Sequence, residues 1–149
     1  MINYVAGFLV DKINESVLLI KKTKPEWQAG RYNAIGGKIE FGESPVDAMQ
    51  REFHEEAGVW IKDWTHRVTL TGGDWRVYFF IAFAEKEVLD KCHLFAHDKD
   101  EIIDIFGISN VVDLWSFTMR GIISNIRWLL PLCLDESVEI AEVWEGYNG

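Results

Sequence analysis

The sequence lacks the features of a membrane or exported protein. No apolar run in its 149 residues approaches the roughly 20 residues that a helix needs to cross a bilayer. The first residues, Met1 to Val5, carry no basic flank, apolar stretch or cleavage site of the kind that marks a signal peptide. We therefore expect a soluble, cytoplasmic protein without a membrane partner.

Cysteine is also scarce. Cys92 and Cys133 stand far apart and form no C-x-x-C pair, which argues against a redox motif or a thiolate zinc site. We expect both to be free thiols in a reducing compartment. His93 and His97 lie near Cys92, but no fourth ligand is close in the sequence, so zinc is not expected.

Positive charge is in deficit. The chain has 24 Asp and Glu against 15 Lys and Arg, a formal net charge of -9, and no basic block. Such a surface repels a polyanion, so a nucleic-acid partner is not expected. If the ligand is itself anionic, we expect a metal cation between its phosphates and the protein's carboxylates, because these groups otherwise repel one another.

The composition that remains is that of one compact domain. The chain is 48% hydrophobic and 13% aromatic, with no internal repeat or linker, so residues 1–149 are expected to form a single domain. Turn residues and apolar spacing predict strands at 2–10, 16–20, 66–71, 75–84 and 101–106, and helices at 44–57 and 121–134. They also predict a long loop at 21–33, an extended segment at 34–43 and a charged irregular segment at 85–100. Strands that lie mainly in hairpins favour an α/β fold in layers, with a mixed, largely antiparallel sheet between helices.

The helix at 44–57 has well-marked ends. Ser44 is a capping residue, Pro45 suits the first helical position, and Gly58 terminates the helix. At about 100° per residue, four apolar side chains fall on one stripe. This stripe, which must face the core, consists of Val46, Met49, Phe53 and Ala57.

Three carboxylates occupy the adjoining stripe of the same helix. Glu52, Glu55 and Glu56 lie one above another, and like charges at this spacing weaken an isolated helix, while Arg51 can neutralise only part of them. A solvated helix surface is one interpretation. However, the stripe adjoins the apolar face, which places the carboxylates in the crevice between helix and sheet. Hard oxygen ligands that converge there suit Mg²⁺, whose coordination substrate phosphates usually complete.

The spacing around this helix resembles the Nudix box at every defined position. The matching residues are Gly37, Glu43, Arg51, Glu52, Glu55, Glu56 and Gly58, with Phe53 and Val59 in the two apolar positions. The box covers residues 37–59, and the order of elements from about residue 2 to 135 is similar to the Nudix fold, an α/β/α sandwich.

The resemblance implies a metal site built on the helix. Its ligands would be Glu52, Glu55 and Glu56, together with the carbonyl of Gly36, and Glu101 would supply the additional acid that MutT-like members often present. The metal would be Mg²⁺, with Mn²⁺ as a substitute. An exposed loop acid is an equally good interpretation of Glu101.

The resemblance also implies the catalytic roles. In-line phosphoryl displacement requires charge neutralisation and a positioned water. Arg51 would orient the glutamates, and Glu43 would support the loop that precedes the helix. Family members differ in the group that takes the proton from water, so Glu52, Glu55 and Glu101 remain candidates.

The segment 31–38 is similar to the R-W-N-x-x-G-G-K segment of Nudix enzymes that act on oxidised purine nucleotides. Asn33 would then contact the base, Asn125 would be a second base-reading amide, and Arg31 and Lys38 would contact phosphate. The alternatives are that Asn33 is a turn residue, that Asn125 lies on a helix surface and that the two cations are simply solvated. The paired aspartates of some family members are absent after Trp115, which argues against narrow specificity.

The implied function is a pyrophosphohydrolase that converts a normal or oxidised nucleoside triphosphate to the monophosphate and pyrophosphate. Hydrolysis of ADP-ribose, a nucleotide sugar or a dinucleotide is the enzymatic alternative. A noncatalytic nucleotide-sensing module is the alternative of another class, although such modules commonly lose box glutamates. The expected partner is a small-molecule nucleotide, and the expected state is a monomer or homodimer.

Overall fold

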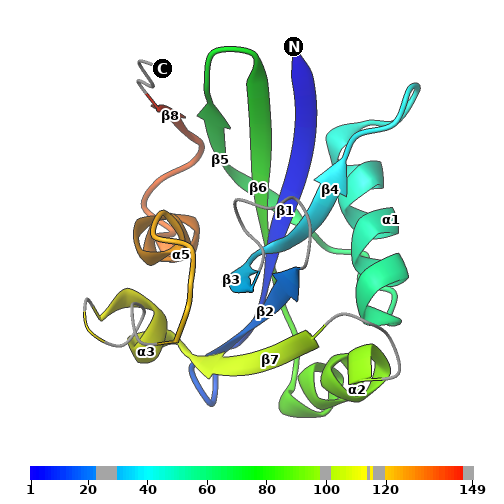
Figure 1. Ribbon diagram of the computed structural model, residues 1–149, viewed down its shortest axis with the longest axis vertical. Coiled ribbons are helices and arrows are strands. Elements are labelled where there is room, and N and C mark those ends of the chain that lie inside the picture. The colour runs from blue at the N-terminus through cyan, green and yellow to red at the C-terminus, as the bar shows by residue number, and fades with distance from the viewer. Residues whose placement is uncertain (23–29, 98–101, 114, 116–119, 146–149) are drawn as a thin grey trace.

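The computed structural model describes residues 1–22, 30–97, 102–113, 115 and 120–145 (Figure 1). Its strands are β1 Ile2–Asp11, β2 Ser16–Lys22, β3 Arg31–Asn33, β4 Ile35–Lys38, β5 Thr65–Thr71, β6 Trp75–Phe83, β7 Ile102–Gly107 and β8 Ala141–Trp144. Its helices are α1 Pro45–Ala57, α2 Lys86–His97, α3 Ile108–Val112 and α5 Ile126–Leu134. Within the described ranges, no helix is long and apolar enough to span a membrane.

The strands form one mixed sheet in the order β3-β2-β1-β6-β5-β8, with β4 paired to β1 and β7 paired to β2. Strand β1 is central and pairs in parallel with β6 from Ile2 to Val10. On its other side β1 pairs first with β4 and then, at its end, with β2. Among the described strands, only β1 with β6 and β5 with β8 are parallel pairs. The expected mixed, largely antiparallel sheet is therefore confirmed.

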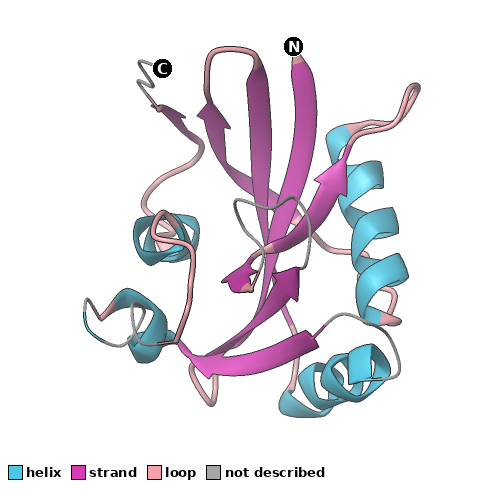
Figure 2. Cartoon of the chain, in the orientation of Figure 1, coloured by secondary structure: helices cyan, strands magenta, loops and turns pink. Residues whose placement is uncertain are grey.

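Helices cover both faces of the sheet, as Figure 2 shows. Side chains alternate along β1, so Phe8 joins one hydrophobic cluster and Leu9 joins another. The first cluster includes Leu129 of α5, and the second includes Phe53 of α1 and Leu89 of α2. Each face of the central strand therefore has its own core, and the α/β/α sandwich is confirmed.

Helix α1 forms as its sequence predicts. Ser44 is the N-cap, and its hydroxyl accepts a 3.2 Å hydrogen bond from the backbone N–H of Asp47. Gly58 ends the helix at φ 74°, a left-handed conformation that favours glycine. Met49 and Phe53 are fully buried against the sheet. The apolar stripe therefore fixes which way the glutamates on the adjoining stripe can point.

The expectation of an irregular segment at 85–100 was wrong, because α2 occupies Lys86–His97. Leu89, Cys92 and Ala96 recur at helical spacing and are buried. The many charged residues between them hide this period in the sequence. Both cysteines are buried and free, as expected, and burial raises the pKa of each thiol to about 12.

Two other boundaries differ from those expected. The predicted loop at 21–33 contains β3, which pairs with the end of β2, and residues 23–29 of that loop lie outside the described part. The last helix begins at Ile126 rather than at Gly121, because residues 121–123 run beside β3 instead. Tyr32 donates its backbone N–H to Gly121 and accepts from Ile123, and backbone committed to these bonds cannot also start a helix.

Two leucines of α2 test this helix directly. Leu89 is 1% exposed and Leu94 is 67% exposed, although both are leucines in the same helix. We expect Leu89→Ala to lower the free energy of unfolding by about 2–5 kcal/mol, because it leaves a cavity in the core. Leu94→Ala should change it by less than about 0.5 kcal/mol. Equal effects in urea denaturation would contradict the placement of α2.

Candidate active site

The guanidinium of Arg51 is the centre of a polar cluster on α1. Its Nε and Nη2 atoms donate to the two carboxylate oxygens of Glu43 at 2.7 and 2.9 Å. Its Nη1 atom donates to Glu52 at 3.0 Å and to Glu55 at 3.3 Å, and Nη2 also donates to the carbonyl of Lys38 at 3.1 Å. One side chain thus connects the helix, the preceding loop and the end of β4.

The pair of Glu43 and Arg51 is a fork-to-fork contact, the geometry in which an arginine binds a carboxylate most specifically. Hydrogen bonds from Arg51 lower the pKa of the Glu43 carboxyl, and Glu43 in turn raises the pKa of the guanidinium. Glu43 also accepts a 2.9 Å hydrogen bond from the backbone N–H of Glu40. Glu43 therefore ties the loop to Arg51, and its supporting role in catalysis stays a prediction.

Glu52 lies directly on the backbone of β4. A Cβ atom added to Gly37 would be 2.5 Å from the Glu52 carboxyl carbon, a distance that no real side chain tolerates. The Glu52 side chain is only 14% exposed, and this burial raises its pKa against the opposing effect of Arg51. Glycine at position 37 therefore makes room for a half-buried carboxylate.

Gly36 packs closely on the neighbouring strand. A Cβ added to it would be 1.9 Å from the carbonyl oxygen of Val5 on β1. Close packing of β4 on β1 thus excludes any side chain at position 36. The carbonyl of Gly36 accepts a 2.9 Å hydrogen bond from Nζ of Lys22.

Lys22 also approaches the last of the three glutamates. Its Nζ lies 3.4 Å from Oε1 of Glu56, and the two side chains are 19% and 15% exposed. Of the predicted metal ligands, Glu52, Glu56 and the Gly36 carbonyl therefore lie beside β4. Glu55 is 56% exposed and contacts Arg51 instead.

The expected metal ligands do not form a ready cage. Within the described ranges, no group of three His, Cys, Asp or Glu side chains is arranged to hold a metal ion. The carboxylates instead have cationic side chains as partners. Glu101, the fifth predicted ligand, lies outside the described residues.

A cavity of about 840 Å³ opens beside this cluster. Its wall includes Lys22, Gly36 and Gly37 and, from the predicted substrate residues, Arg31, Asn33 and Asn125. Lys38 is exposed at the end of β4 and is not part of this wall. The structure therefore brings three of the four predicted substrate residues into one cavity.

Backbone hydrogen bonds bring the two asparagines to the same cavity. Tyr32, next to Asn33, donates its N–H to Gly121 at 2.8 Å and accepts from Ile123 at 3.0 Å. These bonds place the start of α5, where Asn125 is the N-cap, beside β3. Oδ1 of Asn125 is buried and has no hydrogen-bond partner among the described residues.

The Tyr32 side chain connects β3 to β7. Its hydroxyl donates to the carboxylate of Asp104 on β7, and burial together with this contact raises the pKa of Tyr32 to about 12. A tyrosine with this pKa stays neutral in the physiological range. The neutral Tyr32 side chain therefore links β3 and β7, the two strands that flank β2.

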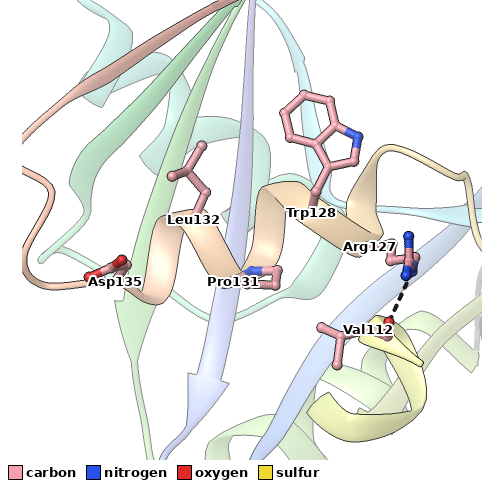
Figure 3. Close-up of a pocket in the computed structure, with 6 residues that line it drawn as sticks. All are labelled: Val112, Arg127, Trp128, Pro131, Leu132 and Asp135. Atoms are coloured by element: carbon pink, nitrogen blue, oxygen red, sulfur yellow. Dashed lines mark hydrogen bonds between the residues drawn. The ribbon is translucent and has the colours of Figure 1, made fainter. Parts of the chain in front are cut away.

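Among the tryptophans, Trp75 lines the cavity, Trp115 is exposed, and Trp27 lies outside the described residues. A second hollow of about 530 Å³ lies against α5 and contains Trp128. Figure 3 shows Arg127 at its edge, bonded to the Val112 carbonyl at 3.1 Å. None of the predicted site residues line it.

Several cavity residues were not predicted from the sequence. Lys22 ends an apolar strand and shows no local motif. Asp74 lies in a turn, and Glu145 lies in the C-terminal region, where the sequence analysis predicts no helix or strand. The alternation of β2 indicates that Lys21 and Lys22 face opposite sides of the sheet. The identity of the Lys22 partners depends on the sheet order, which the sequence does not contain.

Comparisons with known proteins relate the chain to one family. A family model of the NUDIX domain matches residues 3–125. The 8-oxo-dGDP phosphatase NUDT18 of Danio rerio is 38% identical over 38% of this chain and 17% of its own length. The uncharacterized Nudix hydrolase YvcI of Bacillus subtilis is 33% identical over 46% of this chain and 47% of its own length, so the chain spans less than half of either relative. The mutator MutT protein of Bacillus halodurans has the same fold, with a TM-score of 0.68, 18% identity, and coverage of 98% of this chain and 91% of its own.

Two glycines provide a matched test of the Glu52 position. We expect Gly37→Ala to displace the Glu52 carboxylate, because the new Cβ would lie 2.5 Å from its carbon. Gly73→Ala is the control, since nothing lies within 4 Å of an added Cβ there. Titration with Mn²⁺ should show weaker binding for Gly37→Ala alone, by roughly 10–100-fold, the usual cost of disturbing a ligand's support. Unchanged binding in a folded Gly37→Ala protein would contradict this placement.

Proposed function

The chain belongs to the Nudix family, and on that premise we propose that it is a divalent-metal-dependent pyrophosphohydrolase that cleaves the diphosphate linkage of a nucleotide. One observation carries the proposal. A single cavity is lined by Gly36, Gly37, Asn33 and Asn125, and the Glu52 carboxylate lies against Gly37. A carboxylate suited to a metal-bound diphosphate therefore adjoins the wall of the cavity that holds amides suited to a base.

The chemistry of the oxygen donors, rather than their present arrangement, suits a hard divalent cation. Glu52, Glu56 and the Gly36 carbonyl lie on the β4 side of the helix, and Glu55 and Glu101 complete the proposed set, although Glu101 lies outside the described residues. All of these donors are oxygens, which Mg²⁺ prefers, and Mn²⁺ is the natural substitute. A bound cation supplies charge neutralisation for the phosphates and lowers the pKa of a water molecule.

The remaining roles belong to the chain's own residues. Arg51 orients Glu52 and Glu55 through the hydrogen bonds from its Nη1 atom, and Glu43 holds Arg51 in place. Glu52, Glu55 and Glu101 are the candidates for the group that takes the proton from water. Two of these candidates differ in their burial: the side chain of Glu52 is 14% exposed, and that of Glu55 is 56% exposed.

The proposed substrate is a purine nucleoside triphosphate, normal or oxidised, which would yield the monophosphate and pyrophosphate. The amides of Asn33 and Asn125 have the donors and acceptors that read a purine edge, and Trp75 offers an aromatic face in the same cavity. NUDT18, named for activity on 8-oxo-dGDP, supports an oxidised purine and makes the diphosphate a necessary second substrate to test.

A substrate panel with Glu56→Gln tests the proposed chemistry. The amide replaces an anionic ligand at nearly constant volume, so we expect turnover to fall by about 100-fold or more. Mutation of residues that only support a metal ligand usually costs about 10–100-fold in activity. Glu87→Gln on the exposed face of α2 is the matched control and should keep the wild-type rate. The panel contains nucleoside di- and triphosphates, oxidised analogues, ADP-ribose and dinucleotides, each with Mg²⁺ and with Mn²⁺.

Two outcomes would contradict the proposal. A purified Glu56→Gln protein that turns over at the wild-type rate would remove Glu56 from the metal site. A folded wild-type protein that binds nucleotides but hydrolyses none of the panel would instead support the nucleotide-sensing alternative.

Base reading can be tested separately at the two asparagines. We expect Asn125→Ala to lower kcat/KM for the preferred purine nucleotide by a factor that corresponds to roughly 0.5–1.5 kcal/mol, the value of one hydrogen bond. The kcat/KM for ribose 5-triphosphate, which has no base, should hardly change. Asn33→Ala should show the same base dependence. It also removes the 2.8 Å bond that Oδ1 accepts from the N–H of Ala34, so its thermal stability must be measured in parallel. Equal losses on every substrate would assign both residues to the fold or to the phosphate site.

A further inference from the structure

We propose that Lys22 is an internal cation that neutralises the metal-free active site and is displaced when a divalent cation binds. The inference rests on the metal site of the proposed function. It concerns a residue outside the Nudix box, on a strand that precedes the box in the sequence. Its basis is the position of the Lys22 ammonium group between two of the proposed metal ligands.

The contacts of Lys22 are those expected of a bound cation. Nζ donates to the carbonyl of Gly36 at 2.9 Å and lies 3.4 Å from Oε1 of Glu56. Both oxygens belong to the proposed ligand set. The side chains of Lys22 and Glu56 are largely buried, so water screens their attraction less than it would at the surface.

Strand geometry delivers Lys22 to this position. Neighbouring side chains of a strand point to opposite faces, and Lys21 accordingly lies over the ring of Tyr32, with Nζ 5.6 Å from the ring centroid. Lys22 turns towards β4 and also lines the nucleotide cavity. Two adjacent lysines therefore have different environments, and only the second faces the glutamates.

A metal ion and the Lys22 ammonium group cannot share the Gly36 oxygen without strong repulsion. Mg²⁺ binds oxygen at about 2.1 Å, so an ion on this carbonyl would be at most about 5 Å from Nζ in its present position. Two positive charges at that separation in a half-buried site repel. Metal binding therefore requires Lys22 to leave, and its flexible side chain already borders the cavity into which it can turn.

The displacement of Lys22 would have opposite effects on the protein without metal and on the protein with metal. Without metal, the Lys22 ammonium group stabilises the charge of Glu56, a largely buried carboxylate 3.4 Å away. With metal, the freed ammonium group faces the cavity, where an anionic phosphate would attract it. Metal and anionic substrate should therefore strengthen each other's binding through Lys22, as linkage requires.

The first experiment measures Mn²⁺ affinity by calorimetry on protein stripped of metal. We expect Lys22→Met to bind Mn²⁺ roughly three- to tenfold more tightly than wild type, since the competing charged hydrogen bond is gone. Lys21→Met controls for the loss of one positive charge from an already acidic chain and should change affinity little. Lys22→Arg keeps a competing cation and should stay near the wild-type value.

A second measurement uses the wild-type protein and needs no variant to fold. Brief acetylation of lysines, followed by peptide mass spectrometry, reports how accessible each amine is. We expect Lys22 labelling to rise when Mg²⁺ is added, while Lys21 labelling stays constant as the internal reference. In the metal-free state, thermal unfolding of Lys22→Met should also occur at a lower temperature than that of wild type or Lys21→Met.

The outcomes separate this inference from the proposed function. If wild type binds Mn²⁺ and Glu56→Gln abolishes that binding, the metal site stands. In that case, equal Mn²⁺ affinities for Lys22→Met and Lys21→Met, with unchanged Lys22 labelling, would overturn the role of Lys22 alone. If wild type binds no divalent cation, both the metal site and the displacement of Lys22 are wrong.

Discussion

The hydrogen bonds of Arg51 are the contacts on which the geometry of the site depends. The guanidinium holds Glu43 in the loop, Glu52 and Glu55 on the helix and the carbonyl of Lys38 at the end of β4. These partners belong to three segments of the chain, so the fork of Arg51 fixes the relative positions of these segments. Lysine carries the same charge but not the planar set of donors, and it could not hold these oxygens at once. The loop, the strand and the helix thus meet at one residue.

The glutamates of the site carry more negative charge than Arg51 alone can neutralise. Lys22 provides the second cation, beside Glu56 and the Gly36 carbonyl. The two cations differ in a way that matters for function. Arg51 makes several directional bonds and belongs to the framework, whereas Lys22 makes one hydrogen bond and one longer ion pair on a flexible stem. On the proposed metal site, a divalent cation would replace the second without disturbing the first. The acidic stripe would then remain folded without metal and still accept metal when it is present.

The sequence predicted best what depends on neighbouring residues. Ser44, Gly58 and the apolar stripe of α1 act within the helix or at its ends, so that helix and the face of its glutamates could be predicted. Helix α2 was missed because charged residues surround Leu89, Cys92 and Ala96 and hide their period. Strand β3 has only three residues and is recognisable only by its pairing with β2. The partners of Lys22 and the requirement for Gly36 likewise depend on strands packed side by side, which no local pattern specifies.

The two ends of the proposed site are joined by a short piece of backbone. Asn33 ends β3 and Gly36 lies in β4, so only Ala34 and Ile35 separate the proposed base contact from the proposed metal ligand. Even fully extended, that chain spans no more than about 11 Å. Residues 35–37 are held to β1 by pairing, and Tyr32 is bonded to the segment that carries Asn125. If the proposed assignment holds, a shift of the base contacts would pull on the strand that supports Glu52, because Ala34 alone joins β3 to β4.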